Sequence, residues 1–223
     1  MILIFREIGM VGNLILQSRD KNILTVTVNR PEKANSLTIE MLDELAFIFK
    51  RAAADDNLIG VVVTGAGDRV FCAGADLSEL VTGGDDTPDE WSRMAESLRK
   101  IPVMTVALLN GHCMGGGLSL ALGCDIRVSV PKARFAYPVF KNNVLPGQYD
   151  VNSLCSLIGK GRTSIILLGG QTIEADEALQ WGLVDRIIDL SEFDYESEKI
   201  FEIAKSSDRN HQIKIKARIK VSE

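Results

Sequence analysis

Two glycine-containing turns are the features of this sequence best suited to chemistry. The first is Phe71-Cys72-Ala73-Gly74-Ala75-Asp76-Leu77, and the second runs from Asn110 to Leu118 and contains three consecutive glycines, 115–117. Each lies between a predicted buried strand and a predicted helix, where small residues let a ligand approach the backbone and the first N–H groups of the helix are unpaired. Such helix ends donate hydrogen bonds to anions. One N–H from each turn could therefore hold a carbonyl oxygen that gains negative charge, as in an oxyanion hole.

Other kinds of site find less support. Taken singly, each glycine turn could be no more than a tight connection between elements. Residues 65–70 (GAGDRV) begin as Gly-x-Gly but lack the third glycine of a dinucleotide fingerprint, and no glycine run ends in Gly-Lys-Ser/Thr. The four cysteines have no Cys-x-x-Cys spacing, and there are only two histidines, His112 and His211. This pattern argues against a metal site and against a disulfide framework.

Composition bounds the class of protein. With 223 residues, 46% hydrophobic and 25% charged, the chain can form one globular domain with a sizeable core. A net charge of −5 gives no broad basic field, which argues against a nucleic-acid partner. We interpret the seven basic residues between Lys199 and Lys220 as a solvated face or tail. No apolar window reaches eighteen residues, so no membrane-spanning helix is expected. Arg6 and Glu7 interrupt the apolar N-terminus, which argues against a signal peptide. The cysteine usage fits a reducing cytoplasm.

Hydrophobic periodicity predicts an α/β fold that would position the two turns. An amphipathic helix is predicted over 42–53 with Thr38 as its N-cap. Strands at 14–18 and 23–29 are expected to form an antiparallel pair, and the continuous apolar runs 58–64, 103–109 and 126–130 are typical of strands covered on both faces. Further elements are expected later in the chain: helices near 151–158, 162–168 and 174–180, and a strand at 183–188. Alternating strands and helices indicate the α/β class.

Taken together and in order, a series of short motifs resembles the crotonase superfamily, the enoyl-CoA hydratase/isomerase group. The resemblance extends over about residues 14–190. The matching segments are Asn29–Leu37, Val70–Leu77, Asn110–Gly117, Cys124–Arg127, Phe135 with Pro138, Leu145–Gly147, Ala175–Ala178 and Trp181–Val184.

The resemblance implies a crotonase-like spiral of β-β-α repeats, with a core domain at 1–190 and a C-terminal helical segment at 191–223 that is shorter than in typical relatives. It implies a homotrimer or hexamer that binds acyl-CoA or acyl-carrier-protein thioesters, with no tightly bound cofactor, because coenzyme A arrives as part of the substrate. The backbone N–H groups of Ala75 and Gly116 would form the oxyanion hole. The residues carried over to the adenine end of coenzyme A are Lys33, Ala34, Ala73, Asp76 and Leu77.

The sequence departs from the family where two catalytic glutamates are expected. Ser119 and Val139 stand at those positions, and neither side chain exchanges protons near neutral pH. Ordinary hydratase activity is therefore not expected. Tyr149 and Asp150 replace small residues at a helix start facing the acyl pocket, so either could carry a proton instead; an N-cap role is the structural alternative for Asp150.

Three functions remain open from the sequence. The first is an enzyme of the lyase or isomerase class that stabilises a thioester enolate in a backbone oxyanion hole. The second is a decarboxylase of a β-carboxy acyl thioester, since loss of CO₂ creates the enolate without a base. The third is a non-catalytic acyl-CoA-binding protein, because fold does not dictate function.

Overall fold

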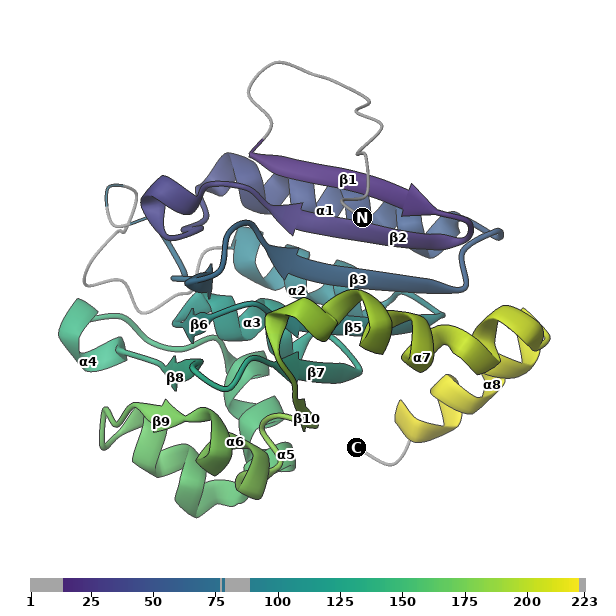
Figure 1. Ribbon diagram of the computed structural model, residues 1–223. Helices are drawn as coiled ribbons and strands as arrows, with labels where there is room; N and C mark the ends of the chain where they lie inside the picture. Colours follow the sequence, from purple (N-terminus) through teal and green to yellow (C-terminus); the bar gives the residue numbers. More distant parts are fainter. Residues whose placement is uncertain (1–13, 77, 79–88, 221–223) are drawn as a thin grey trace.

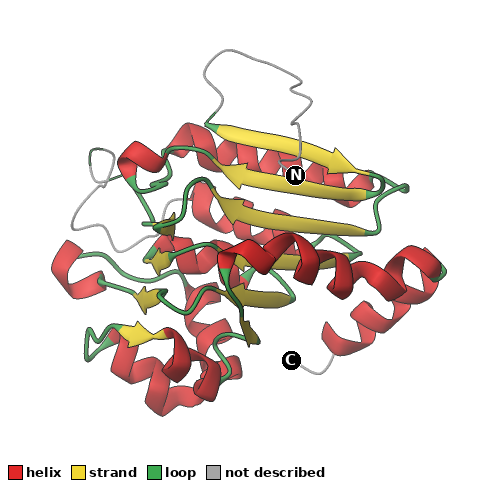
Figure 2. Cartoon of the chain, viewed as in Figure 1, coloured by secondary structure: helices red, strands yellow, loops and turns green. Residues whose placement is uncertain are grey.

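The computed structural model describes residues 14–76, 78 and 89–220, which form two sheets surrounded by helices (Figures 1 and 2). The larger sheet has six strands in the order β1-β2-β3-β5-β7-β10. Its strands are β1 (Ile15–Asp20), β2 (Ile23–Val28), β3 (Gly60–Gly65), β5 (Met104–Leu109), β7 (Ile126–Ser129) and β10 (Arg186–Ile187). β1 and β2 are antiparallel and the remaining pairs are parallel, which confirms the predicted opening pair and the predicted buried strands.

Helices cover both faces of the larger sheet, which explains why its central strands are apolar on both sides. α1 (Ile39–Ala54) and α2 (Asp89–Arg99) lie behind the sheet in Figure 1, and α7 (Phe193–Ser206) crosses its front. α1 begins as predicted, because the side chain of Thr38 accepts a hydrogen bond from the Met41 N–H at 3.2 Å. On the other face, a Cβ at Gly60 would lie 2.0 Å from the ring of the fully buried Phe201. The glycine therefore lets α7 approach β3 closely.

The smaller sheet carries the glycine turns. Its four strands, in spatial order, are β4 (Val70–Cys72), β6 (His112–Met114), β8 (Arg134–Ala136) and β9 (Ile173–Glu174). β4 and β6 are parallel, so their carboxyl ends meet at the same edge of the sheet. The first glycine turn follows β4, and the second leads from β6 into α3 (Gly116–Leu122). The helix predicted after Asp76 falls mainly on residues outside the described part of the chain.

The later elements differ in extent from the prediction. The helices predicted at 151–158 and 162–168 are both present in the segment labelled α5 (Gln148–Leu167), and the non-helical angles of Gly159, φ 80° and ψ 158°, separate them. The strand predicted at 183–188 is reduced to β10, because the N–H groups of Leu183 and Val184 both bind the carbonyl of Ala178 and so close the end of the preceding helix. Shorter helices are η1 (Pro31–Lys33), α4 (Val139–Asn142), α6 (Ala175–Trp181) and η2 (Leu190–Glu192).

The interpretation of the basic C-terminal residues as a solvated face or tail is wrong for two of them. The ammonium of Lys216, on α8 (Arg209–Lys220), donates to the carbonyl of Val103 at 2.7 Å and to Asp125 at 2.5 Å, and Lys216 is buried. Arg209 donates to the carbonyl of Leu58 at 2.8 Å. Both cations are drawn in because these partners replace the water that burial removes. No described helix is long and apolar enough to cross a membrane.

Candidate active site

The two glycine turns are in direct contact. Gly74 has φ at 91°, and a Cβ on it would lie 2.8 Å from the Gly116 nitrogen and 3.0 Å from the Met114 carbonyl oxygen. A Cβ on Gly117 would lie 2.4 Å from the Cys72 carbonyl oxygen. The distances of 2.8 Å at Gly74 and 2.4 Å at Gly117 are too short for any side chain, so glycine is required at both positions for this approach. The structure thus brings together the two turns that the sequence singled out.

One N–H group from each turn is available to a ligand. The Leu37 N–H donates to the Gly74 carbonyl at 2.8 Å, and the Leu37 carbonyl accepts from the Asp76 N–H at 2.9 Å. In this parallel bridge the N–H of the intervening Ala75 points away from Leu37. Gly116 is the first residue of α3, so its N–H has no partner within the helix. No described residue accepts a hydrogen bond from either group.

A tryptophan from α2 closes one side of Gly116. A Cβ on Gly116 would lie 2.1 Å from the indole ring of Trp91, so the ring packs directly against the glycine backbone. An apolar ring in this place keeps water from that side of the N–H group, and hydrogen bonds to charge are stronger where water is excluded. Sequence reasoning missed Trp91 because nothing in its local pattern links it to the second glycine turn.

Two buried asparagines fix the backbone that leads into the first glycine turn. Asn35 is fully buried; its amide donates to the carbonyls of Ala66 at 3.0 Å and Val70 at 2.7 Å, and its side-chain oxygen accepts from the Arg30 N–H at 2.9 Å. Asn110 accepts from the Gly65 N–H at 3.0 Å. These bonds fix the connection between β3 and β4, and so the position of the turn that follows β4. The sequence showed both asparagines only as parts of the family motifs.

Asp150 lies in a buried cluster with two hydroxyl groups. Its Oδ2 accepts from the Ser119 hydroxyl at 2.5 Å and from the Tyr137 hydroxyl at 2.7 Å, and the residue is 4% exposed. Burial raises the pKa of Asp150, and the hydrogen bonds from Ser119 and Tyr137 oppose the increase. The alternative that Asp150 is an N-cap is wrong, because Gly147 is the N-cap of α5 and Asp150 lies within the first turn. The Ser119 hydroxyl therefore donates to an acid from another helix.

Tyr149 is directed to a different place from Asp150. Its hydroxyl donates to the carbonyl of Leu122 at 2.9 Å, at the end of α3, and the guanidinium of Arg99 lies 4.3 Å from the centre of its ring. Tyr149 thus links α5 to α3 and α2 and is engaged in packing. The structure brings Ser119 and Asp150 together, and it does not place the Tyr149 hydroxyl on that carboxyl.

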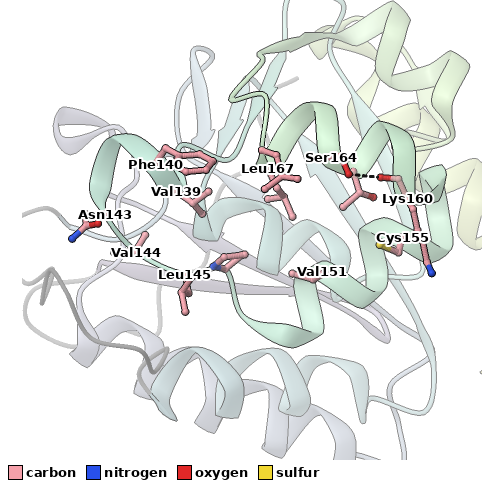
Figure 3. A pocket seen from close by; sticks show the side chains of 13 residues that line it. Val139, Phe140, Asn143, Val144, Leu145, Val151, Cys155, Lys160, Ser164 and Leu167 are labelled. Atoms are coloured by element: carbon pink, nitrogen blue, oxygen red, sulfur yellow. Dashed lines mark hydrogen bonds between the residues drawn. The ribbon is translucent and has the colours of Figure 1, made fainter.

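Val139, at the second expected glutamate position, lines an apolar cavity of about 680 Å³ between α4 and α5 (Figure 3). The side chains of Val139, Phe140 and Leu167 are grouped on one side of the cavity in this view, with Leu145 and Val151 opposite. Val139 is 7% exposed. Neither the glycine turns nor Ser119 belongs to the cavity lining, so Val139 is the candidate site residue that reaches it.

The residues that the family resemblance assigns to coenzyme A binding lie next to the first turn. The Ala34 carbonyl accepts from the Ala73 N–H at 3.1 Å, which places the Lys33–Ala34 turn beside it. The Asp76 carboxylate accepts from the Ser78 N–H at 3.0 Å, from the Ser78 hydroxyl at 2.7 Å and from Arg30 at 2.5 Å. These bonds hold the pKa of Asp76 well below its usual range, and those from Ser78 are the largest cause of the decrease. Leu77 lies outside the described residues, and the coenzyme A contacts stay a prediction.

Comparisons with known proteins agree with this geometry. The family model described as enoyl-CoA hydratase/isomerase matches residues 18–222. A curated relative, the short-chain-enoyl-CoA hydratase of Clostridium acetobutylicum, is 33% identical over 186 residues, which cover 82% of this chain and 71% of the relative. A crystal structure of enoyl-CoA hydratase from Bacillus anthracis superposes with a TM-score of 0.86 at 29% identity, covering 93% of this chain and 82% of that one.

A second solved structure, DspI of Pseudomonas aeruginosa, gives a TM-score of 0.87 at 26% identity and covers 97% of this chain and 84% of that one. The fold is therefore the crotonase fold that the sequence motifs predicted. The motifs around both glycine turns lie within the matched range, and so do Ser119 and Val139. The chain belongs to the enoyl-CoA hydratase/isomerase family.

Proposed function

We propose that this protein binds acyl thioesters of coenzyme A and stabilises their enolate form, with the thioester oxygen held between the N–H groups of Ala75 and Gly116. The observation that carries the proposal is the contact between the two glycine turns, which leaves one backbone donor of each without a partner among the described residues. The family to which the chain belongs processes acyl-CoA, which supplies the substrate class.

The mechanism follows from where charge develops. When an electron pair moves from the α-carbon of the acyl group toward the carbonyl, the oxygen becomes negative, and two fixed N–H donors stabilise that charge without having to reorganise. Trp91 excludes water from one side of the Gly116 donor. Loss of one donor of this kind costs about 2.7 to 4 kcal/mol in the activation barrier.

The fate of the enolate is governed by Ser119 and Val139. Neither can activate water, so addition of water to the β-carbon is not the proposed reaction. The proposal is a lyase or isomerase reaction through the enolate. Decarboxylation of a β-carboxy thioester is the second candidate, favoured because it needs no base to form the enolate and the described site supplies a single buried carboxyl, Asp150.

The family resemblance extends the proposal to the location of the protein, its oligomeric state and the form of its substrate. We propose that the protein works in the cytoplasm as a homotrimer or hexamer and that an acyl-carrier-protein thioester is the alternative form of the substrate. Exposed apolar side chains on α4 and beyond α5, Phe140 and Leu168, support an assembly that covers part of this surface.

A pair of variants tests the role of the Gly116 N–H. Proline at the first position of a helix is well tolerated, but its ring would collide with Trp91. We therefore compare Trp91→Ala with the double variant Trp91→Ala, Gly116→Pro, which differ in the N–H group while both lack the indole. We expect the double variant to lose enolate formation by about 10²- to 10³-fold relative to Trp91→Ala.

The measurements are acyl-CoA affinity by calorimetry and the rate of any turnover. Circular dichroism and the unfolding temperature of both variants show whether α3 is retained. Equal affinity and equal rates in the two folded variants would show that the Gly116 N–H does not hold the thioester oxygen, and the proposal would then be wrong.

A further inference from the structure

We propose that Asp150, reaching the site from α5, is the proton carrier of this protein and acts at the α-carbon of the thioester, with Ser119 and Tyr137 as positioning residues. The inference rests on the proposed function, because it requires an acyl thioester in the Ala75–Gly116 site. It gives the site a carboxyl for proton transfer, although Ser119 and Val139 stand at the two positions where glutamates are expected.

The position of the carboxyl follows from α3. Gly116 and Ser119 are three residues apart on this helix, so they lie on the same side, one turn apart. The Ser119 hydroxyl is 2.5 Å from Asp150 Oδ2. A glutamate in place of Ser119 would direct its own carboxyl into this region. Asp150 thus brings a carboxyl from α5 to a point one turn along α3 from Gly116, whose N–H is proposed to hold the thioester oxygen.

The position of the second expected glutamate, Val139, lies close in the chain to another residue that contacts the Asp150 carboxyl. Tyr137 is two residues before Val139 in the chain, and its hydroxyl donates to the same Oδ2 at 2.7 Å. Both hydroxyls therefore fix one oxygen of the carboxyl. The other oxygen, Oδ1, has no hydrogen-bond partner in the described part of the chain and can exchange a proton with a ligand. Burial favours the protonated form and raises the pKa of Asp150 toward the range useful for proton transfer.

The chemistry is limited to one proton. The Asp150 carboxylate takes a proton from the α-carbon, the C–H electron pair forms the enolate double bond, and the carbonyl electron pair moves to the oxygen held by the two N–H groups. Return of a proton from Asp150 to the α-carbon reverses these steps. The same protonation completes a decarboxylation. Val139 leaves the other position apolar, so no second group is present there to activate water for the β-carbon.

The test is exchange of α-hydrogen for deuterium in butyryl-CoA, incubated with the full-length protein in D₂O and followed by mass spectrometry. We expect the wild type to incorporate deuterium and Asp150→Asn to do so about 10²- to 10⁴-fold more slowly. Asparagine keeps an oxygen that accepts from Ser119 and Tyr137, so the fold is retained. The matched control is Glu196→Gln, a second buried acid, on α7 and paired with Arg186, which should exchange at the wild-type rate.

The pH profile separates catalysis from a structural role. The hydroxyls of Ser119 and Tyr137 are the groups of the described chain that act on Asp150 besides burial, and both lower its pKa. Exchange requires the carboxylate, so its rate should rise with pH through this pKa. Removing one donor in Ser119→Ala or Tyr137→Phe raises the pKa, and the rise should shift to higher pH. An unshifted profile in both variants would overturn the assignment.

Binding of butyryl-CoA distinguishes a failure of Asp150 as the proton carrier from a failure of the proposed thioester site. Calorimetry with butyryl-CoA should give the same affinity for the wild type and Asp150→Asn. If the wild type binds butyryl-CoA but Asp150→Asn exchanges deuterium as fast as it does, or if neither exchanges, Asp150 is not the proton carrier and the thioester site stands. If butyryl-CoA does not bind to the wild type, the proposed function itself fails.

Discussion

Purified wild-type protein should hydrate crotonyl-CoA at least about 10²-fold more slowly than an ordinary enzyme rate of about 10 s⁻¹. The reason is the chemistry of the two positions: Ser119 is bound to Asp150, and Val139 is buried in an apolar wall. A water molecule beside the β-carbon would have no acid or base from either residue. The measurement is the loss of absorbance of the conjugated thioester, and a wild-type rate near 10 s⁻¹ would contradict this account of the site.

Restoring the glutamates should restore hydration if the rest of the site is competent. Because Ser119 Oγ lies 2.5 Å from Asp150 Oδ2, a glutamate at 119 would meet a second carboxyl, and like charges at that distance oppose each other. The variant therefore combines Ser119→Glu and Val139→Glu with Asp150→Gly. We expect its hydration rate to exceed the wild-type rate by about 10²- to 10⁴-fold.

The matched control replaces both positions with glutamine in the same Asp150→Gly background. It has nearly the same shape but no group that exchanges protons, so it should stay at the wild-type level. Equal rates in the glutamate and glutamine variants, both folded, would show that the site lacks more than these two carboxyls.

Asn35→Gly should lower the free energy of unfolding, because it removes the buried amide that holds the backbone before the first turn. It leaves the Arg30 N–H and the carbonyls of Ala66 and Val70 without the Asn35 amide. The Val70 carbonyl keeps the Asn110 amide at 3.4 Å, so the Arg30 N–H and the Ala66 carbonyl are the two groups left unpaired. At about 1 to 3 kcal/mol for each, the free energy of unfolding should fall by about 2 kcal/mol or more. Glycine is used because Asn35 has φ at 53°, where alanine would add backbone strain.

The control for Asn35→Gly is Asn143→Gly. Asn143 has φ at 49° and caps the end of α4, but it is exposed, so the same substitution there removes no comparable network. Urea unfolding of both variants measures the difference. A loss for Asn35→Gly no greater than that for Asn143→Gly would mean that the buried amide does not hold the approach to the glycine turn.

Much of the fold was predictable because its signals are local. Continuous apolar strands and the Thr38 cap indicate their elements through burial and hydrogen bonding within a few residues. The two helical segments on either side of Gly159 were predictable for the same reason, and the non-helical angles of the glycine separate them. Lys216 shows the limit, because its partners, Asp125 and the Val103 carbonyl, are about a hundred residues away in the chain.

The candidate site was predictable where it is made of backbone and not where it is made of side chains from different elements. Glycines at 74, 116 and 117 indicated the two turns, because a Cβ at any of these positions would collide with its neighbours, and Gly115 adds a φ of 53° that favours glycine. The sequence named Ser119 and Asp150 separately, but their hydrogen bond depends on how α5 packs on α3. Trp91 had no signal for the same reason: its contact with Gly116 is set by the packing of α2.

The most direct test of the central claim is the carbonyl stretching frequency of bound butyryl-CoA, isolated by an infrared difference between thioesters with and without ¹³C at the carbonyl carbon. Two N–H donors on the oxygen should weaken the C=O bond, so we expect a lower frequency in the Trp91→Ala complex than for the free thioester in water. In the Trp91→Ala, Gly116→Pro complex the frequency should return toward the free value. A carbonyl frequency equal to that of the free thioester in both complexes would contradict the assignment of Ala75 and Gly116 as the donors that hold the thioester oxygen.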